Sequence, residues 1–137
     1  KNIAQLFEDE LPSELIRLGQ YGVQYVASSR RLKPPNQPPH WLRQRLGSLG
    51  LTGLLILDTR PILDWFSEAA LLAADLVIAP VKDRAALVNT AALHEVMAAA
   101  GRCERLWLLP SLVDTRARLN AEVRVHEVLA YAARERD

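Results

Sequence analysis

The chain has little of what disulfides, metal sites and membrane spans are made of. Its 137 residues include one cysteine, Cys103, and three histidines. One thiol forms no internal disulfide, and the scattered histidines have no metal-binding spacing. No apolar run approaches the roughly 18 residues of a membrane span, and no signal peptide opens the chain. These absences predict a protein of a reducing cytoplasm, without a membrane segment.

The chain also lacks an excess of charge of either sign. Seventeen Lys and Arg against sixteen Asp and Glu leave a net charge of +1. No global field therefore draws the protein to nucleic acid or to an anionic membrane. Fourteen of the basic residues are Arg, which either favours planar pairing with carboxylates and phosphates or reflects a GC-rich coding source. The length predicts a single domain over residues 1–137.

Apolar periodicity and capping residues predict the order of elements along the chain. The first part should contain a short helix over 12–19, a strand over 22–29 with Val23, Tyr25 and Ala27 inward, a proline-rich connector and a helix over 40–49. The rest should contain a strand over 54–58, a helix over 65–73 capped by Asp64, a strand over 74–81, a helix from Asp83 to near Gly101, a strand over 104–110 and an amphipathic helix over 116–135.

This alternation predicts an α/β fold with a doubly wound, mostly parallel sheet and helices on both faces. The buried strand residues should be Leu55, Leu57, Val77, Ile78, Leu106 and Leu108, in adjacent parallel strands. Ligands in such sheets bind outside the carboxyl ends of the strands, and Asp58, Lys82 and Ser111 all fall there.

The stretch LLILDTRP, residues 54–61, places a carboxylate at the end of an apolar run. Asp58 can hold one Mg²⁺ coordination position, as the Walker B residue of a P-loop nucleotidase does. It can equally cap the turn or helix that follows, because acidic residues end many strands of α/β proteins. The pattern alone leaves both interpretations open. Asp75 begins a strand at the opposite end of the sheet, so we expect it to cap or terminate an element.

Residues 54–101 resemble the central part of the ParA/MinD family of deviant Walker-type P-loop ATPases. An apolar strand ends in D-x-x-P at Asp58 and Pro61, a helix follows, and the next strand carries Ala74-Asp75 and Pro80-Val81. The stretch LPSLVDTRARLNAEV, residues 109–123, is similar to the family's segment near the nucleotide base. The resemblance runs from about Gly22 to the C-terminus.

Membership of this family implies an ATP-dependent molecular switch for chromosome or plasmid partitioning or for cargo positioning. The resemblance implies ATP and Mg²⁺ as cofactors of the intact protein, with Asp58 as the metal ligand. The implied nucleotide-site residues are Thr59, Pro61, Pro110 and Ser111. Non-specific DNA binding is implied for Arg116, Arg118 and Arg124, although a solvated helix face is the competing interpretation. The implied partners are a second copy of the chain in a homodimer, DNA, and a ParB-like or cargo adaptor protein.

The chain departs from the family in lacking its Gly-rich loop, K-G-G-x-G-K-[ST], whose backbone N–H groups and lysine neutralise the phosphates. None of the six glycines precedes a lysine. We therefore expect this chain alone to bind no ATP and to have no catalytic residue. Because it begins with Lys1, we expect that the P-loop unit has been removed. A P-loop strand would lie beside residues 54–58, so its removal predicts a dimer formed near that edge or a swapped segment from residues 1–30.

Three alternatives stay open for the function. The chain can be part of the ATPase, or a degenerate, non-enzymatic relative that serves as a scaffold or dimerisation module. It can also be a receiver-like domain with Asp58 phosphorylated, for which Lys82 is the only lysine at a suitable strand end. Arg60, where the family often has a second proline, makes the loop after Asp58 less stiff.

Overall fold

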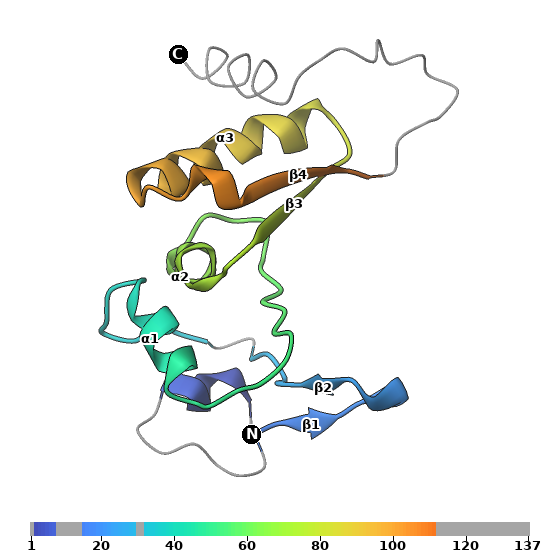
Figure 1. The fold of residues 1–137 in the computed structure, drawn as a ribbon, viewed down its shortest axis with the longest axis vertical. Coiled ribbons are helices and arrows are strands. Elements are labelled where there is room, and N and C mark those ends of the chain that lie inside the picture. Colours follow the sequence, from blue (N-terminus) through green and yellow to red (C-terminus); the bar gives the residue numbers. More distant parts are fainter. Residues whose placement is uncertain (1, 8–14, 30–31, 112–137) are drawn as a thin grey trace. The chain divides into compact units, whose positions relative to one another are not determined.

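The computed structural model describes residues 2–7, 15–29 and 32–111 (Figure 1). The chain divides into two compact units, residues 1–37 and residues 38–137. The first unit is built around a small antiparallel hairpin. Its elements are η1 (Ile3–Phe7), β1 (Arg17–Leu18), η2 (Gln20–Gly22) and β2 (Gln24–Tyr25). Tyr21 and Gly22 have positive φ angles of 60° and 77°, and they turn the chain between the two strands.

The helix expected over residues 12–19 is wrong where the structure describes it. Residues 17 and 18 form β1, and residues 12–14 lie outside the described residues. The backbone N–H of Gly19 donates to the carbonyl oxygen of Val23 at 2.7 Å, which closes the hairpin. The stretch with helical spacing is short, and short helices are marginally stable on their own. The pairing within the hairpin therefore determines the structure here.

The strand expected over residues 22–29 shortens to β2, and its inward side chains are not inward. Val23 is 62% exposed and Tyr25 is 47% exposed, while Ala27 is half-buried. A two-stranded hairpin has no second layer to cover a face, so the alternation in the sequence does not lead to burial here.

Except for the strand over 54–58, the second unit contains the helices and strands that the periodicity predicted for its described residues, and it adds one short helix before the last strand. They are α1 (Trp41–Gly47), α2 (Trp65–Ala73), β3 (Val77–Val81), α3 (Arg84–Ala99), η3 (Cys103–Arg105) and β4 (Leu106–Pro110). Asp64 and Asp83 cap α2 and α3 as expected. The helix expected over 116–135 lies outside the described residues.

β3 and β4 are parallel neighbours, joined by the crossover helix α3 (Figure 1). Val77 pairs with Leu106 and Val81 with Pro110. The ladder continues one residue further, because the N–H of Ser111 donates to the carbonyl oxygen of Val81 at 2.9 Å. The parallel pairing of these strands is confirmed. The described part of the chain thus has α/β content with one parallel pair, and the doubly wound sheet stays a prediction.

The core of this unit lies between the helices and one face of the β3–β4 pair. α1 packs on α2, α2 on α3, and α3 on β3. The most buried residues are Leu42 of α1, Ser67, Ala69, Ala70 and Leu71 of α2, Ala79 of β3, and Thr90, Ala91 and Met97 of α3. Met97 is fully buried, so it is the large side chain on which this packing centres.

The second face of the β3–β4 pair is apolar and exposed in the described structure. Ile78 is 54% exposed, Trp107 61% and Leu109 52%. The expectation that Ile78 is buried is therefore wrong, because no described helix covers the face to which it points. On the opposite face Val77, Leu106 and Leu108 are half-buried, as alternation along the strands requires.

The apolar stretch 54–58 forms no strand. It runs as coil between α1 and α2, and none of the described strands pairs with it (Figure 1). Leu54 is 91% exposed, Leu55 50% and Ile56 79%, whereas Leu57 is half-buried. The expected burial of Leu55 and the expected strand beside β3 are both wrong here. A strand needs a partner for its backbone groups, and the described residues supply none.

Candidate nucleotide site

The residues expected at the metal end of the site lie on an exposed loop before α2. Asp58, Thr59 and Pro61 are all exposed. Within the described ranges, the side chain of Asp58 makes no hydrogen bond or ion pair. An exposed carboxylate of this kind is available to a cation, and it supplies one ligand of the several that a cation needs.

Asp64, not Asp58, caps the helix that follows the loop. Its Oδ1 accepts from the backbone N–H groups of Phe66 at 3.0 Å and Ser67 at 3.1 Å. The N–H of Asp64 donates in return to Oγ of Ser67 at 2.8 Å. This reciprocal capping box satisfies the N–H groups of Phe66 and Ser67 in the first turn of α2. The interpretation of Asp58 as the cap of this helix is therefore wrong.

The carboxylate of Asp64 also anchors the loop through an ion pair with Arg60. Burial tends to raise the pKa of Asp64, but the N–H groups of Ser67 and Phe66, the hydroxyl of Ser67 and the charge of Arg60 together lower that pKa below its ordinary value of 3.8. Residues 59–63 form the loop between Asp58 and Asp64, and the Arg60–Asp64 ion pair joins this loop to the fixed start of α2.

Pro110 and Ser111 lie where β4 ends, beside the end of β3. Lys82, the next residue after β3, is exposed and lies 3.9 Å from Asp83, measured from Nζ to Oδ2. Asp83 Oδ1 accepts from the N–H of Ala86 at 2.8 Å and so caps α3. The carboxyl ends of the two strands therefore bring Lys82 and Ser111 to one edge, as expected.

The two halves of the expected nucleotide site are not joined in the described structure. Among the described residues, no hydrogen bond links Asp58, Thr59 or Pro61 to Pro110 or Ser111. The described ranges also hold no group of three or more His, Cys, Asp or Glu side chains that could bind a metal ion. The proposed DNA contacts at Arg116, Arg118 and Arg124 lie outside these ranges.

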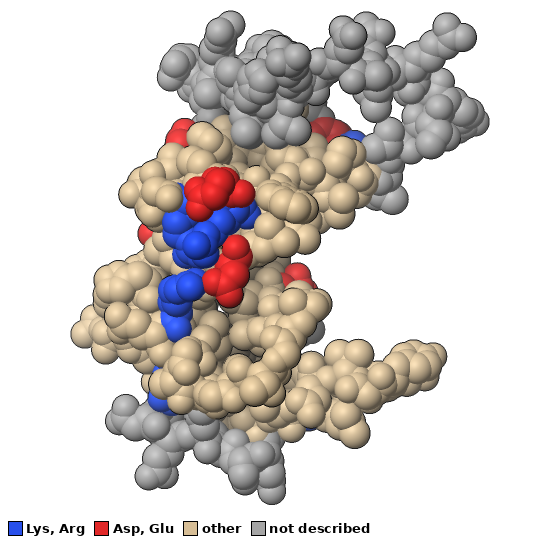
Figure 2. All heavy atoms as spheres, in the orientation of Figure 1, with Lys and Arg blue, Asp and Glu red and all other residues tan. Residues whose placement is uncertain are grey.

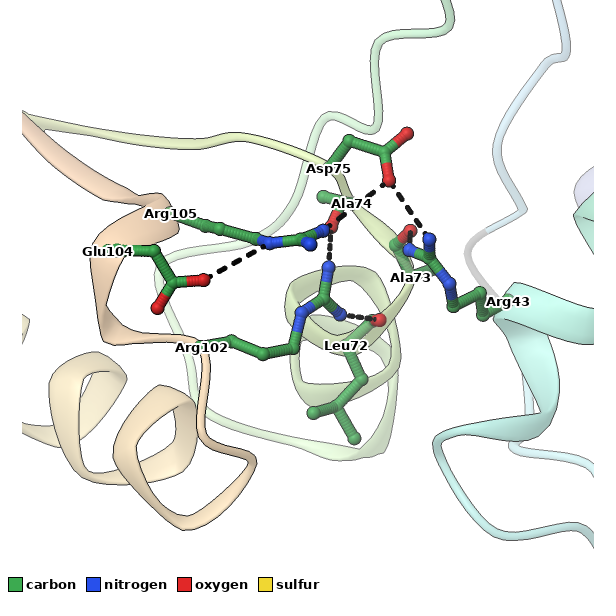
Figure 3. Close-up of polar contacts among 8 residues, drawn as sticks. All are labelled: Arg43, Leu72, Ala73, Ala74, Asp75, Arg102, Glu104 and Arg105. Atoms are coloured by element: carbon green, nitrogen blue, oxygen red, sulfur yellow. Dashed lines mark hydrogen bonds and ion pairs between the residues drawn. The ribbon is translucent and has the colours of Figure 1, made fainter.

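A cluster of charged side chains that the sequence did not predict lies at the C-terminal end of α2. We call it the α2 C-terminal cluster; its members are Arg43, Arg102, Arg105, Asp75 and Glu104 (Figure 3). Basic and acidic atoms gather side by side on this face of the second unit (Figure 2). Arg43 comes from α1, Asp75 from the turn before β3, and the others from η3 and its flank.

Two arginines of this cluster, Arg43 and Arg102, donate to the last carbonyl groups of α2. Arg43 Nη1 donates to the carbonyl oxygen of Ala73 at 2.8 Å. The guanidinium of Arg102 donates to the carbonyl oxygens of Leu72 and Ala74. The last carbonyls of a helix have no partner within the helix and carry its negative dipole end, so cationic donors stabilise them. The cluster therefore serves as a cap made of side chains from other elements (Figure 3).

Asp75 connects two of these arginines. Its Oδ1 lies 3.0 Å from Nη2 of Arg43 and 3.7 Å from Nη1 of Arg105. Burial lowers the pKa of Arg102, and the charges of Arg105 and Arg43 lower it further, while Asp75 and Glu104 oppose the shift. The carboxylates thus allow three guanidinium groups to gather at one helix end. Asp75 has a structural role in this arrangement.

Sequence patterns miss this cluster because its donors lie far from α2 along the chain. Arg43 donates to a carbonyl 30 residues away, and Arg102 to carbonyls 30 and 28 residues away. Capping rules identify donors within a helix or its flanks. The sequence signal for this cluster is limited to one position: Arg102 directly follows Gly101, and Gly101 ends α3 with a φ of 66°.

In the parts of the chain that are described, no helix has the length and apolar character needed to span a membrane. Comparison with protein-family models, with curated proteins and with solved structures found no match to this chain. The residues themselves therefore carry the functional argument.

Proposed function

We propose that this chain is part of a ParA/MinD-like, ATP-dependent molecular switch that positions DNA or another cargo in the cytoplasm. What supports the proposal is the order of elements: apolar residues ending in Asp58, the D-x-x-P loop, α2, β3 with Pro80-Val81, α3 and β4. The parallel pairing of β3 with β4 is the arrangement that such a fold requires.

The observation that carries the proposal is the exposed, unpaired apolar stretch 54–56 ahead of the exposed carboxylate of Asp58. In the family that the sequence resembles, the P-loop strand lies beside this stretch. If the P-loop strand is missing from such a sheet, the apolar side chains of the neighbouring stretch are left exposed to water. Leu54 and Ile56, 91% and 79% exposed, fit this explanation.

The residues present fit only part of a Mg-ATP site. Asp58 can supply one carboxylate to Mg²⁺, and Thr59 and Pro61 would set the course of its loop. Pro110 and Ser111 would lie near the base, as the resemblance implies. The chain has no Gly-rich loop before a lysine to hold the phosphates. Nucleotide binding in this proposal therefore needs a P-loop from the rest of the intact protein.

Calorimetric titration with Mg-ATP tests the proposal in two forms of the protein. The 137-residue chain should give no binding heat up to millimolar nucleotide, because Asp58 alone cannot hold a triphosphate. The gene upstream of the codon for Lys1 should encode K-G-G-x-G-K-[ST], and the product that includes it should bind. In that longer product Asp58→Asn should weaken Mg-ATP binding. A complete gene without the loop would overturn the proposal.

A second candidate is a non-enzymatic scaffold or dimerisation module. The exposed apolar stretch 54–56 favours it, since such a surface marks association in proteins of this size. It becomes the better explanation if the complete gene has no P-loop and the protein associates without nucleotide.

A further inference from the structure

One face of the β3–β4 pair is covered and the other is open in the described structure. α3 packs against β3 on the covered side. On the open face Ile78, Trp107 and Leu109 are 54%, 61% and 52% exposed. Apolar side chains of this size are costly to leave in water, and sheets in folded domains carry a further layer on such a face.

The chain that follows β4 carries an apolar stripe with helical spacing. Residues 112–137 lie outside the described residues, so the pattern comes from the sequence alone. Its apolar positions recur at intervals of four, three and four residues, which places them on one face of a helix. We call this set the C-terminal stripe; its members are Ala121, Val125, Val128 and Ala132.

A second line of apolar residues in the same segment is less continuous. Leu119, Val123 and Ala130 share another side of the helix, and His126 falls among them. The C-terminal stripe has no polar residue within it between positions 121 and 132. The stripe is therefore the side of the helix that is suited to a core.

The stripe and the open face match in length and in shape. A helix spans about 17 Å between residues 121 and 132, at about 1.5 Å per residue. A strand as long as β3 or β4 also spans about 17 Å, at about 3.3 Å per residue. The open face carries large side chains, whereas the stripe consists of alanine and valine, and large and small residues interdigitate across a packed layer.

The connection to β4 favours this segment over a separate molecule. The N–H of Ser111 still donates to Val81, so the chain leaves directly from the end of the strand pair. Residues 112–120 can turn the chain back, because each extended residue reaches about 3.3 Å. A segment held by so short a connection has an effective concentration on the order of millimolar, which a free partner seldom reaches.

We infer that residues 119–133 form a helix antiparallel to β4, and that its C-terminal stripe covers Ile78, Trp107 and Leu109. The open face is then an internal layer of the second unit, closed to a second copy and to other proteins. The order of elements does not determine which face the last helix covers or which of its sides meets that face. The inference goes beyond the proposed function and does not depend on it. The experiments contain no nucleotide, so their failure and that of the ATP titrations are distinguishable.

Hydrogen exchange of the intact 137-residue chain tests whether the segment docks. An isolated helix of about 15 residues is marginal in water, so slow exchange there requires packing. The amides of residues 121–132 should exchange about 100-fold more slowly than in an unstructured chain, at every protein concentration. Exchange at the unstructured rate would overturn the inference. Protection that rises with protein concentration would also overturn it, because a second copy would then hold the segment.

A pair of valine variants tests which side of the helix docks. Val128→Asp places a carboxylate in the stripe and should abolish the protection of residues 121–132. Val123→Asp is the matched control, since position 123 lies about 170° around the helix from the centre of the stripe. Both variants lose the same side chain and gain the same charge, so helix propensity does not distinguish them. Equal exchange in the two variants, or loss of protection in Val123→Asp alone, would contradict the assigned side.

A pair of isoleucine variants tests the face of the sheet. Ile78→Asp should abolish the protection of residues 121–132, whereas Ile62→Asp should keep it. The two isoleucines are similarly exposed, at 54% and 58%, but Ile62 lies in the loop before α2. Slow exchange in α3 shows that a variant remains folded, and Leu109→Asp replaces Ile78→Asp if α3 loses its protection. Protection that survives a substitution on the open face would mean that the segment packs elsewhere, and would overturn the inference.

Discussion

Asp64 fixes the start of α2 with more contacts than any other single carboxylate described here. Its Oδ1 accepts from two backbone N–H groups, and its own N–H reaches Ser67 Oγ. Asp64→Ala removes both accepted bonds and the ion pair with Arg60. We expect the free energy of unfolding to fall by about 1 kcal/mol, within the range of about 0.5–2 for lost caps. Urea denaturation measures this loss.

Asp64→Asn serves as the control for that substitution, because the amide oxygen keeps the cap while the charge is removed. Its loss should stay below that of Asp64→Ala, since exposed ion pairs contribute about 0–1 kcal/mol. Equal losses for the two variants would mean that the ion pair with Arg60, and not the cap, anchors this loop.

The lowered pKa of Asp64 predicts how its contribution depends on pH. The folded state holds the carboxylate ionised more strongly than the unfolded chain does, where the ordinary value is 3.8. The stabilisation is therefore fully present above that pH and is lost as pH falls through the lower folded value. The difference in unfolding free energy between the parent chain and Asp64→Asn should be constant above about pH 5 and shrink below about pH 4. A difference that grows on acidification would contradict the assigned direction.

At the scale of elements, the C-terminal end of α2 depends on a side chain from η3's flank. Arg102→Ala would leave the carbonyls of Leu72 and Ala74 without these donors. We expect a loss of about 1–3 kcal/mol in unfolding free energy, because these half-buried carbonyl groups lose a charged donor. Arg102→Lys should recover only part of it, because one ammonium does not match the planar fork of the guanidinium. Urea denaturation and amide exchange of the last turn of α2 report the effect.

Arg105→Ala is the matched control within the same cluster. Arg105 pairs with Asp75 and Glu104, whose side chains are 85% and 68% exposed, and it donates to no helix carbonyl in the described contacts. Its removal should cost less than about 1 kcal/mol. A larger loss for Arg105→Ala than for Arg102→Ala would show that ion pairing, and not capping, holds the cluster together.

The elements that could be predicted are those whose signals are local. Asp64 and Asp83 cap helices at the positions expected, because a cap needs only the two or three residues that follow it. The end of α3 near Gly101 was equally predictable, because helices often end at a residue with positive φ and glycine adopts that conformation readily. The parallel pair β3–β4 followed from two apolar runs separated by a helix.

The features that could not be predicted depend on partners distant in the chain. Residues 54–58 carry the apolar run of a buried strand, but a strand forms only where another supplies hydrogen bonds. Ile78 lies on the exposed face of the β3–β4 pair. Its burial would need a further layer of structure on that face, and alternation along the strands does not predict one. Asp58 was predicted to lie at the end of a strand, but it lies on an exposed loop, and no hydrogen bond links it to its candidate partners Pro110 and Ser111 among the described residues.

At the scale of the whole chain, the core of the second unit draws on its own residues. Leu42, Leu71, Ala79 and Met97 are buried, and all of them follow residue 37. In the first unit, Leu15 is the buried apolar residue among those described. Because these residues belong to one compact unit, we expect their core to form when residues 1–37 are removed.

A double-mutant cycle tests this independence. Met97→Ala removes a fully buried side chain, and we expect it to cost about 2–5 kcal/mol in the complete chain. The same substitution in residues 38–137 alone should cost the same within about 0.5 kcal/mol, because sites without shared partners add. Urea denaturation of the four proteins gives the coupling, and unfolding should remain cooperative in the shortened chain. A coupling above about 1 kcal/mol would mean that residues 1–37 help to build the core around Met97, and that the chain folds as one cooperative domain.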